Sequence, residues 1–81
     1  MTHTPHELSE EFPADIEIMH KLKMENAHFS KLHDEYHEVN REIHRIEIEE
    51  EAASDAVTEE MKKQRLLLKD EIYQMIVEAK S

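Results

Sequence analysis

The sequence predicts an all-α protein: an antiparallel two-helix hairpin of the coiled-coil type, preceded by an extra N-terminal helical segment. Three observations point to this class. The chain of 81 residues contains no glycine, and both of its prolines lie within the first 13 positions. Residues that favour helices, such as Glu, Lys, Leu, Met and Ala, are abundant in the remainder. Apolar residues recur at alternating steps of three and four in two long stretches, as they do along the contact line of a coiled coil.

A single small domain fits this length, and we expect four segments within it. They are a flexible or short helical arm over residues 1–12, a first helix over 13–50, a turn over 51–55 and a second helix over 56–79. The first helix should start at Pro13, because proline suits the first turn of a helix. It should bend or break near Asn26, because asparagine can cap a following helix.

Each predicted helix carries an apolar seam. The members in the first helix are Phe29, Leu32, Tyr36, Val39, Ile43 and Ile46. Those in the second helix are Met61, Leu68, Ile72, Met75 and Ala79, and Arg65 interrupts their spacing. If the chain folds back on itself, Val39 faces Leu68 and Tyr36 faces Ile72.

The reversal between the helices contains three consecutive acids at positions 49–51, which oppose the helix dipole and repel one another. Ser54 or Asp55 can then cap the second helix by accepting backbone N–H bonds. Because no glycine is present to supply the usual left-handed residue, we expect several residues to share the bend. Beside the turn, Glu47 and Lys62 are expected to form an exposed ion pair.

The second helix is apolar over more width than one partner helix can cover. The additional apolar residues are Leu66, Leu67, Tyr73, Ile76 and Val77, and the polar residues at their rim are Arg65, Lys69, Asp70 and Glu71. A lone hairpin of this size also buries little apolar surface. We therefore expect this surface to meet the helix starting at Pro13, a second copy of the chain or another protein. A second copy would assemble the hairpins into a helical bundle.

Composition argues against several functional classes. Without cysteine there are no disulfides, thiolate zinc ligands or thiol nucleophiles, and without glycine there are no phosphate-cradling loops. Two or three helices cannot hold paired carboxylates in a dry cleft, so we expect no enzyme, no catalytic residue and no cofactor. The net charge of −10 disfavours nucleic acid as a partner. Without a membrane-length apolar run or a basic, apolar leader, we expect a cytoplasmic protein.

Two alternatives remain beside an interaction or structural protein. His33, His37 and His44 follow one helical face, where the first two could chelate a transition metal. A dedicated site needs three or four converging ligands, so we favour a solvated polar face and predict no specific metal site. The basic stretch over residues 62–69 could make the protein an RNA- or nucleoid-associated adaptor or dock on an acidic partner, although neutralising the acids of the first helix explains it better.

Several sequence blocks resemble the YdcH-like family of short, uncharacterised, mostly proteobacterial proteins. These blocks are HELSEEFP at 6–13, IHRIE at 43–47 and, most specifically, KQRLLLKDEIY at 63–73. The resemblance implies a helical hairpin in a bacterial cytoplasm and brings no assigned activity. Members often carry a glycine after the block that ends at Glu47, where this chain has Ile48 followed by three glutamates.

Overall fold

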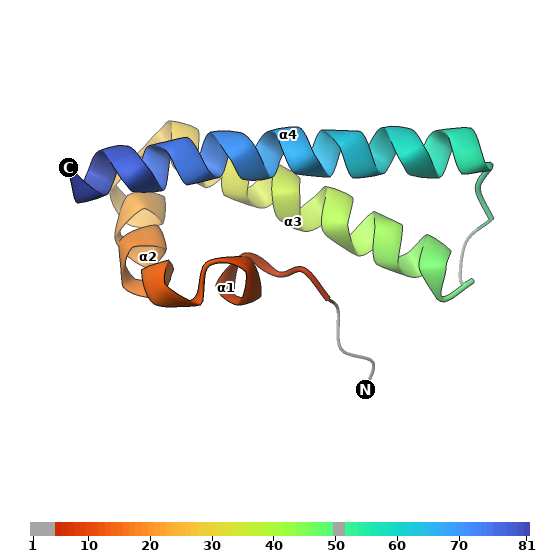
Figure 1. The fold of residues 1–81 in the computed structure, drawn as a ribbon, viewed down its shortest axis with the longest axis horizontal. Helices are drawn as coiled ribbons and strands as arrows, with labels where there is room; N and C mark the ends of the chain where they lie inside the picture. Colours follow the sequence, from red (N-terminus) through yellow and green to blue (C-terminus); the bar gives the residue numbers. More distant parts are fainter. Residues whose placement is uncertain (1–4, 50–51) are drawn as a thin grey trace.

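A computed structural model describes residues 5–49 and 52–81, and it confirms the all-α class. The helices follow in the order α1 (Leu8–Glu11), the 3₁₀ turn η1 (Pro13–Asp15), α2 (Ile16–Glu25), α3 (Ala27–Glu47) and α4 (Asp55–Lys80). α3 and α4 pack as the predicted antiparallel hairpin, and their axes diverge toward the connection between them (Figure 1). The N-terminal α1 and α2 turn back onto this hairpin near its other end.

Side-chain caps define where the two long helices begin. Asn26 separates α2 from α3 with an extended backbone, and its Oδ1 accepts a hydrogen bond from the N–H of Phe29 at 3.0 Å. Ser54 precedes α4, and its hydroxyl oxygen accepts a hydrogen bond from the N–H of Val57 at 3.2 Å. Both caps satisfy N–H groups that lack a partner in the first turn of a helix.

α3 ends at Glu47, earlier than the predicted end at residue 50. The chain leaves the helix because Glu49 adopts a left-handed φ of 65°, while its N–H bonds to the carbonyl of Ile46 at 3.0 Å. Glu49 therefore supplies the left-handed conformation that a glycine would usually provide at this point. Positions 50–51 of the predicted turn lie outside the described residues.

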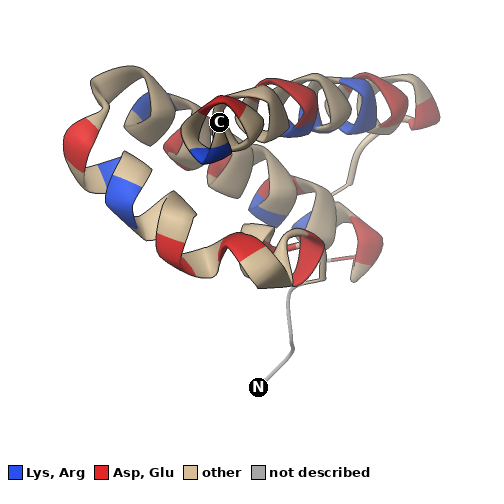
Figure 2. Cartoon of the chain, turned by 60° about the vertical axis from the view of Figure 1, so that its left-hand side comes forward, with Lys and Arg blue, Asp and Glu red and all other residues tan. Residues whose placement is uncertain are grey.

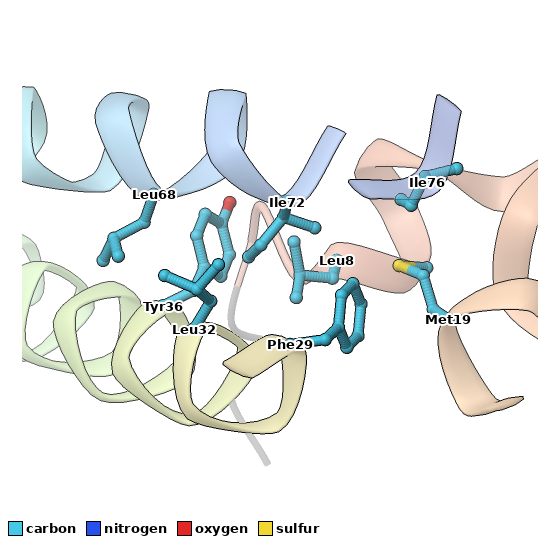
Figure 3. Packing of buried hydrophobic residues seen from close by; sticks show 8 residues of the cluster. All are labelled: Leu8, Met19, Phe29, Leu32, Tyr36, Leu68, Ile72 and Ile76. Carbon is cyan, nitrogen blue, oxygen red and sulfur yellow. The ribbon is translucent and has the colours of Figure 1, made fainter. Parts of the chain in front are cut away.

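The core lies where the N-terminal segment meets the two long helices (Figure 3). Its buried members are Leu8, Met19, Phe29, Leu32, Tyr36, Leu68, Ile72 and Ile76. Tyr36 and Ile72, which the two seams predict to face each other, both belong to it. Leu8 comes from α1 and Met19 from α2, so the N-terminal segment completes a core that a lone hairpin would leave open.

Candidate interaction surface

The predicted apolar contact residues of α4 divide into one buried residue and four exposed ones. Ile76 is fully buried, so it is a core residue and not a contact residue, contrary to our prediction. The exposed side chains are Leu66, Leu67, Tyr73 and Val77, with relative exposures of 56%, 65%, 48% and 39%. α4 therefore presents apolar surface to solvent, but less of it than the sequence suggests.

The N-terminal segment accounts for the difference. Ile76 lies beside Met19 of α2 in the core (Figure 3). The ring of Phe12 stacks on that of Tyr73, with centroids 5.7 Å apart and planes inclined by 15°. The helical segment starting at Pro13, one of the three expected covers, therefore covers Ile76 through Met19, and Phe12 just before it covers part of Tyr73.

The exposed apolar residues project from two different faces of α4. Successive residues of an α-helix are rotated by about 100°, so Leu66, Tyr73 and Val77, spaced by seven and four, share one face. Asp70 lies between them on that face. Leu67 projects from another face and lines a hollow there with Val57 and Met61. We call Leu66, Asp70, Tyr73 and Val77 the α4 stripe.

Arg65, predicted as a rim residue, is partly buried and bonds to a residue of α3. Its Nη1 donates a hydrogen bond to Oδ1 of Asn40 at 2.9 Å. Asn40 is buried, and its Nδ2 donates in turn to the carbonyl of Pro5 at 2.9 Å. This chain of bonds joins α4, α3 and the N-terminal segment, so the arginine that interrupts the seam of α4 has a structural partner.

The Tyr36 hydroxyl makes a parallel connection by donating to the carbonyl of His6 at 2.7 Å. Burial raises the pKa of Tyr36 to about 12, which keeps the hydroxyl protonated and able to donate. His6 has a left-handed φ of 61°, an unfavourable conformation that surrounding contacts must hold. Sequence reasoning missed this network, and its available signal was the polar residue Asn40 beside one seam and Arg65 within the other.

The other predicted rim residues are Lys69, Asp70 and Glu71, of which Asp70 lies within the α4 stripe. Nζ of Lys69 lies 3.6 Å from Oε2 of Glu11, in a partly exposed pair. A hydrogen bond from His6 holds the pKa of that glutamate below its usual value, and Lys69 acts in the same direction. Asp70 and Glu71 are exposed and form no ion pair with any described residue.

The ion pair expected near the turn does not form. Glu47 and Lys62 are both described, and no ion pair joins them. Figure 1 shows the reason, because the axes of α3 and α4 diverge toward this end of the hairpin. The basic stretch over 62–69 is also less available to a ligand than its sequence suggests, since Arg65 and Lys69 are engaged within the chain.

The candidate metal-binding histidines face the N-terminal segment and the surrounding solvent. His33 and His37 line a hollow of about 260 Å³ between α1, α2 and α3, together with His20. Nδ1 of His37 lies 3.3 Å from Oε2 of Glu7, and burial lowers the pKa of His33. His44 does not line this hollow. Within residues 5–49 and 52–81, no three His, Asp or Glu side chains are grouped so as to hold a metal ion. Metal binding by these histidines stays an alternative that no observation favours.

A family model described as "Protein of unknown function (DUF465)" matches residues 29–76, which cover most of α3 and most of α4. The chain belongs to the DUF465 family. The match spans more than half of this chain and includes both seams of the hairpin with Asn40 and Arg65. α1, α2 and the residues Pro5, His6 and Phe12 that contact the hairpin precede the part of this DUF465 protein that the family model covers.

Similarity to individual proteins agrees with that assignment. The chain is 35% identical to the "Uncharacterized protein YdcH" of Escherichia coli (strain K12) over 65 residues, covering 80% of this chain and 88% of that protein. It is similar to the same extent to the "Uncharacterized protein YdcH" of Shigella flexneri. These matches confirm the YdcH-like resemblance. No solved structure matches this DUF465 protein, and no helix in its described part is long and apolar enough to cross a membrane.

Proposed function

We propose that this DUF465 protein is a non-enzymatic interaction module that docks on a protein partner through the outer face of α4. The observation that supports this function is the α4 stripe, where Leu66, Tyr73 and Val77 remain exposed after the N-terminal segment has folded back. Scattered exposed apolar residues are common on protein surfaces, but three that share one helical face, grouped around Asp70, provide enough apolar surface to contact a partner.

The inner face of α4 packs against the core, so the α4 stripe on the outer face is a preformed surface for docking. Ile72 and Ile76 are fully buried and pack the inner face of α4 into the core. α4 is also the longest helix of the described chain, from Asp55 to Lys80. A helix held in this way loses little conformational entropy when a partner binds, so a modest contact area can yield useful affinity.

Cross-linking inside the cell tests the proposal. A benzophenone amino acid at Tyr73 replaces one aromatic side chain by another and places the reactive group on the α4 stripe. The matched control carries it at Lys31 of α3, whose side chain is 74% exposed. We expect a discrete adduct on illumination from position 73 and none from position 31. No adduct from either position, or the same adducts from both, would contradict docking through α4.

We place this module in the cytoplasm as part of the same proposal. The cysteine-free composition suits a reducing compartment, where disulfides would contribute nothing to so small a fold. Fractionation of cells that express the untagged chain tests the location, and recovery in the periplasmic or membrane fraction would contradict it.

A further inference from the structure

We propose that the hairpin also receives a basic amphipathic helix of a partner protein, in a groove between α3 and α4. Two adjoining hollows form this groove, and Met61 and Gln64 of α4 line both of them. The other lining residues that matter here are Glu35, Glu38, Val39 and Glu42 of α3 with Val57 and Leu67 of α4. We call it the open groove. It is a different surface from the α4 stripe, so this inference goes beyond the proposed function.

The open groove lies on the flank of the hairpin that the N-terminal segment does not cover. Successive residues of an α-helix are rotated by about 100°, so Asn40 and His37 point to one side of Tyr36, and Val39 and Glu35 point to the other. On the first side, Asn40 bonds to the carbonyl of residue 5 and His37 approaches the carboxylate of residue 7. The N-terminal segment therefore packs on one flank, and the groove runs along the opposite one.

The floor of the open groove is apolar. Figure 1 shows that α3 and α4 diverge toward the connection between them. Val39 and Met61, one from each seam, are only partly buried there. Val57 and Leu67 continue the apolar surface along α4, with relative exposures of 46% and 65%. Apolar side chains between two helices provide the contact surface on which the apolar face of a third helix can pack.

The rim of the open groove on α3 is acidic. Glu35, Glu38 and Glu42 are three and four residues apart and share one side of the helix. The cations beside them come from α3 itself, since Nζ of Lys31 lies 4.0 Å from Oε1 of Glu35 and Arg45 pairs with Glu42. Glu38 is exposed and forms no ion pair with any described residue. This rim therefore offers negative charge to a cationic partner.

The cations of α4 do not neutralise that rim. Acidic and basic residues follow one another along α4 (Figure 2), but they point to different sides of it. Lys62, Arg65 and Lys69, three and four residues apart, share the flank toward the N-terminal segment, where the last two are engaged within the chain. On the groove flank, α4 contributes one acid and one base, Glu60 and Lys63. The net charge of the groove is therefore set by α3 and is negative.

These features favour a basic amphipathic helix as the occupant. Its apolar face packs on the floor, and its Lys and Arg side chains lie beside the acids of α3. The net charge of −10 attracts such a helix and repels an acidic partner, including a second copy of this chain. Along α4 the lining extends from residue 56 to residue 67, or about 16 Å, which suits a helix of about three turns.

A synthetic peptide of about 14 residues, with leucines on one helical face and lysines on the other, provides the first test. We expect the full chain to bind it in fluorescence anisotropy at 0.05 M salt. Leu67→Gln should weaken binding at least fivefold, because it removes part of the apolar floor. Leu66→Gln, the matched control on the α4 stripe, should leave it unchanged. No binding at 1 mM, or equal binding of a peptide with glutamates in place of lysines, would overturn the inference.

Charge reversal on the rim provides the second test. Glu38→Lys should weaken binding of the basic peptide at least threefold, because it places a cation beside the bound lysines. Glu17→Lys is the matched control, since Glu17 is exposed on α2 and its replacement changes the net charge equally. Equal weakening by both variants would mean that the overall charge attracts the peptide and that the groove does not hold it.

Methionine methyl resonances locate the bound peptide. Met61 lines the open groove, whereas Met24 of α2 lies away from it and is 76% exposed. With methyl-labelled methionine, the peptide should shift the resonance of Met61 and leave that of Met24 in place. A shift of Met24 without one of Met61 would contradict binding between α3 and α4.

This inference and the proposed function fail separately. An adduct from position 73 in cells, together with no binding of the basic peptide, would overturn the open groove and leave docking through the α4 stripe intact. Peptide binding that Leu67→Gln weakens, together with no adduct from position 73, would support the groove and contradict the stripe.

Discussion

Asn40 and Arg65 are polar residues in or beside an otherwise apolar seam. In either helix alone, such a side chain would have no hydrogen-bond partner at the apolar contact line. In the fold they bond to each other, and Asn40 also holds the carbonyl of Pro5. Together with the Tyr36 hydroxyl on the carbonyl of His6, they fasten the N-terminal segment to the hairpin. Buried polar groups are costly when unpaired, so these side chains stabilise the arm only as a complete set.

Replacing Tyr36 with Phe should therefore lower the free energy of unfolding by about 1 kcal/mol, because the carbonyl of His6 loses its donor. Tyr73→Phe is the matched control, since the Tyr73 side chain is half-exposed and stacked on Phe12. It should change stability by less than about 0.5 kcal/mol. Urea denaturation measures both values, and equal effects of the two substitutions would show that the Tyr36 hydroxyl does not hold the segment.

We expect His33 to make the free energy of unfolding depend on pH. Burial lowers its pKa from the usual value of 6.5, so the unfolded chain binds this proton more readily than the folded chain. The free energy of unfolding should therefore be unaffected by this proton above pH 6.5, fall as the pH drops below 6.5, and stop falling below the pKa of His33 in the folded state. His33→Gln should reduce the loss of stability between pH 7.5 and 5.5, as measured by urea denaturation. An unchanged pH dependence in the variant would exclude this role.

At the scale of elements, α4 contributes to both the core and the exposed surface. Its inner face contributes Leu68, Ile72 and Ile76 to the core, and its outer face carries the α4 stripe. The boundary between the two faces depends on how far the N-terminal segment reaches across the helix. Ile76 lies on the covered side of this boundary, and the next residue, Val77, lies on the exposed side.

These neighbours should respond differently to truncation. Ile76→Ala should lower the free energy of unfolding by about 2–4 kcal/mol, because it removes buried methyl groups and leaves a cavity. Val77→Ala should lower it by less than about 0.5 kcal/mol in the monomer. Chemical denaturation at a concentration where the chain is monomeric separates the two. A large effect of Val77→Ala under that condition would place it in the core instead.

At the scale of the whole molecule, acidic charge opposes compaction. The net charge of −10 lies on a chain of 81 residues, and most of it lies outside α4. The ion pairs of the N-terminal segment offset part of this repulsion, as between Lys80 and Asp15 at 2.6 Å. Self-repulsion destabilises the folded state more than the expanded one, and salt screens it.

Raising the salt concentration from 0.02 M to 0.5 M should therefore increase the Tm, since the screened repulsion outweighs a few partly exposed ion pairs. Thermal unfolding followed by circular dichroism measures the change. Sodium chloride and potassium chloride should act alike, which distinguishes screening from specific ion binding. A decrease in Tm would mean that the ion pairs contribute more than the net repulsion.

Local chemistry in the sequence determined the class of fold. Heptad spacing predicts two facing seams, Asn26 and Ser54 mark helix starts by capping, and the absence of glycine and of late prolines favours long helices. Each of these effects operates within one or two helical turns, so it can be predicted before any tertiary contact is known. The surplus of apolar residues on α4 is also visible at this level.

Tertiary structure alone decided which part of that surplus stays exposed. Ile76 is buried and Arg65 finds a hydrogen-bond partner because segments distant in sequence pack against α4. The contact of Tyr36 with His6 spans 30 positions and that of Asn40 with Pro5 spans 35. No local pattern encodes such a pairing, because burial depends on what the chain brings against a side chain and not only on the side chain itself. The α4 stripe is the apolar surface that remains after those contacts have formed.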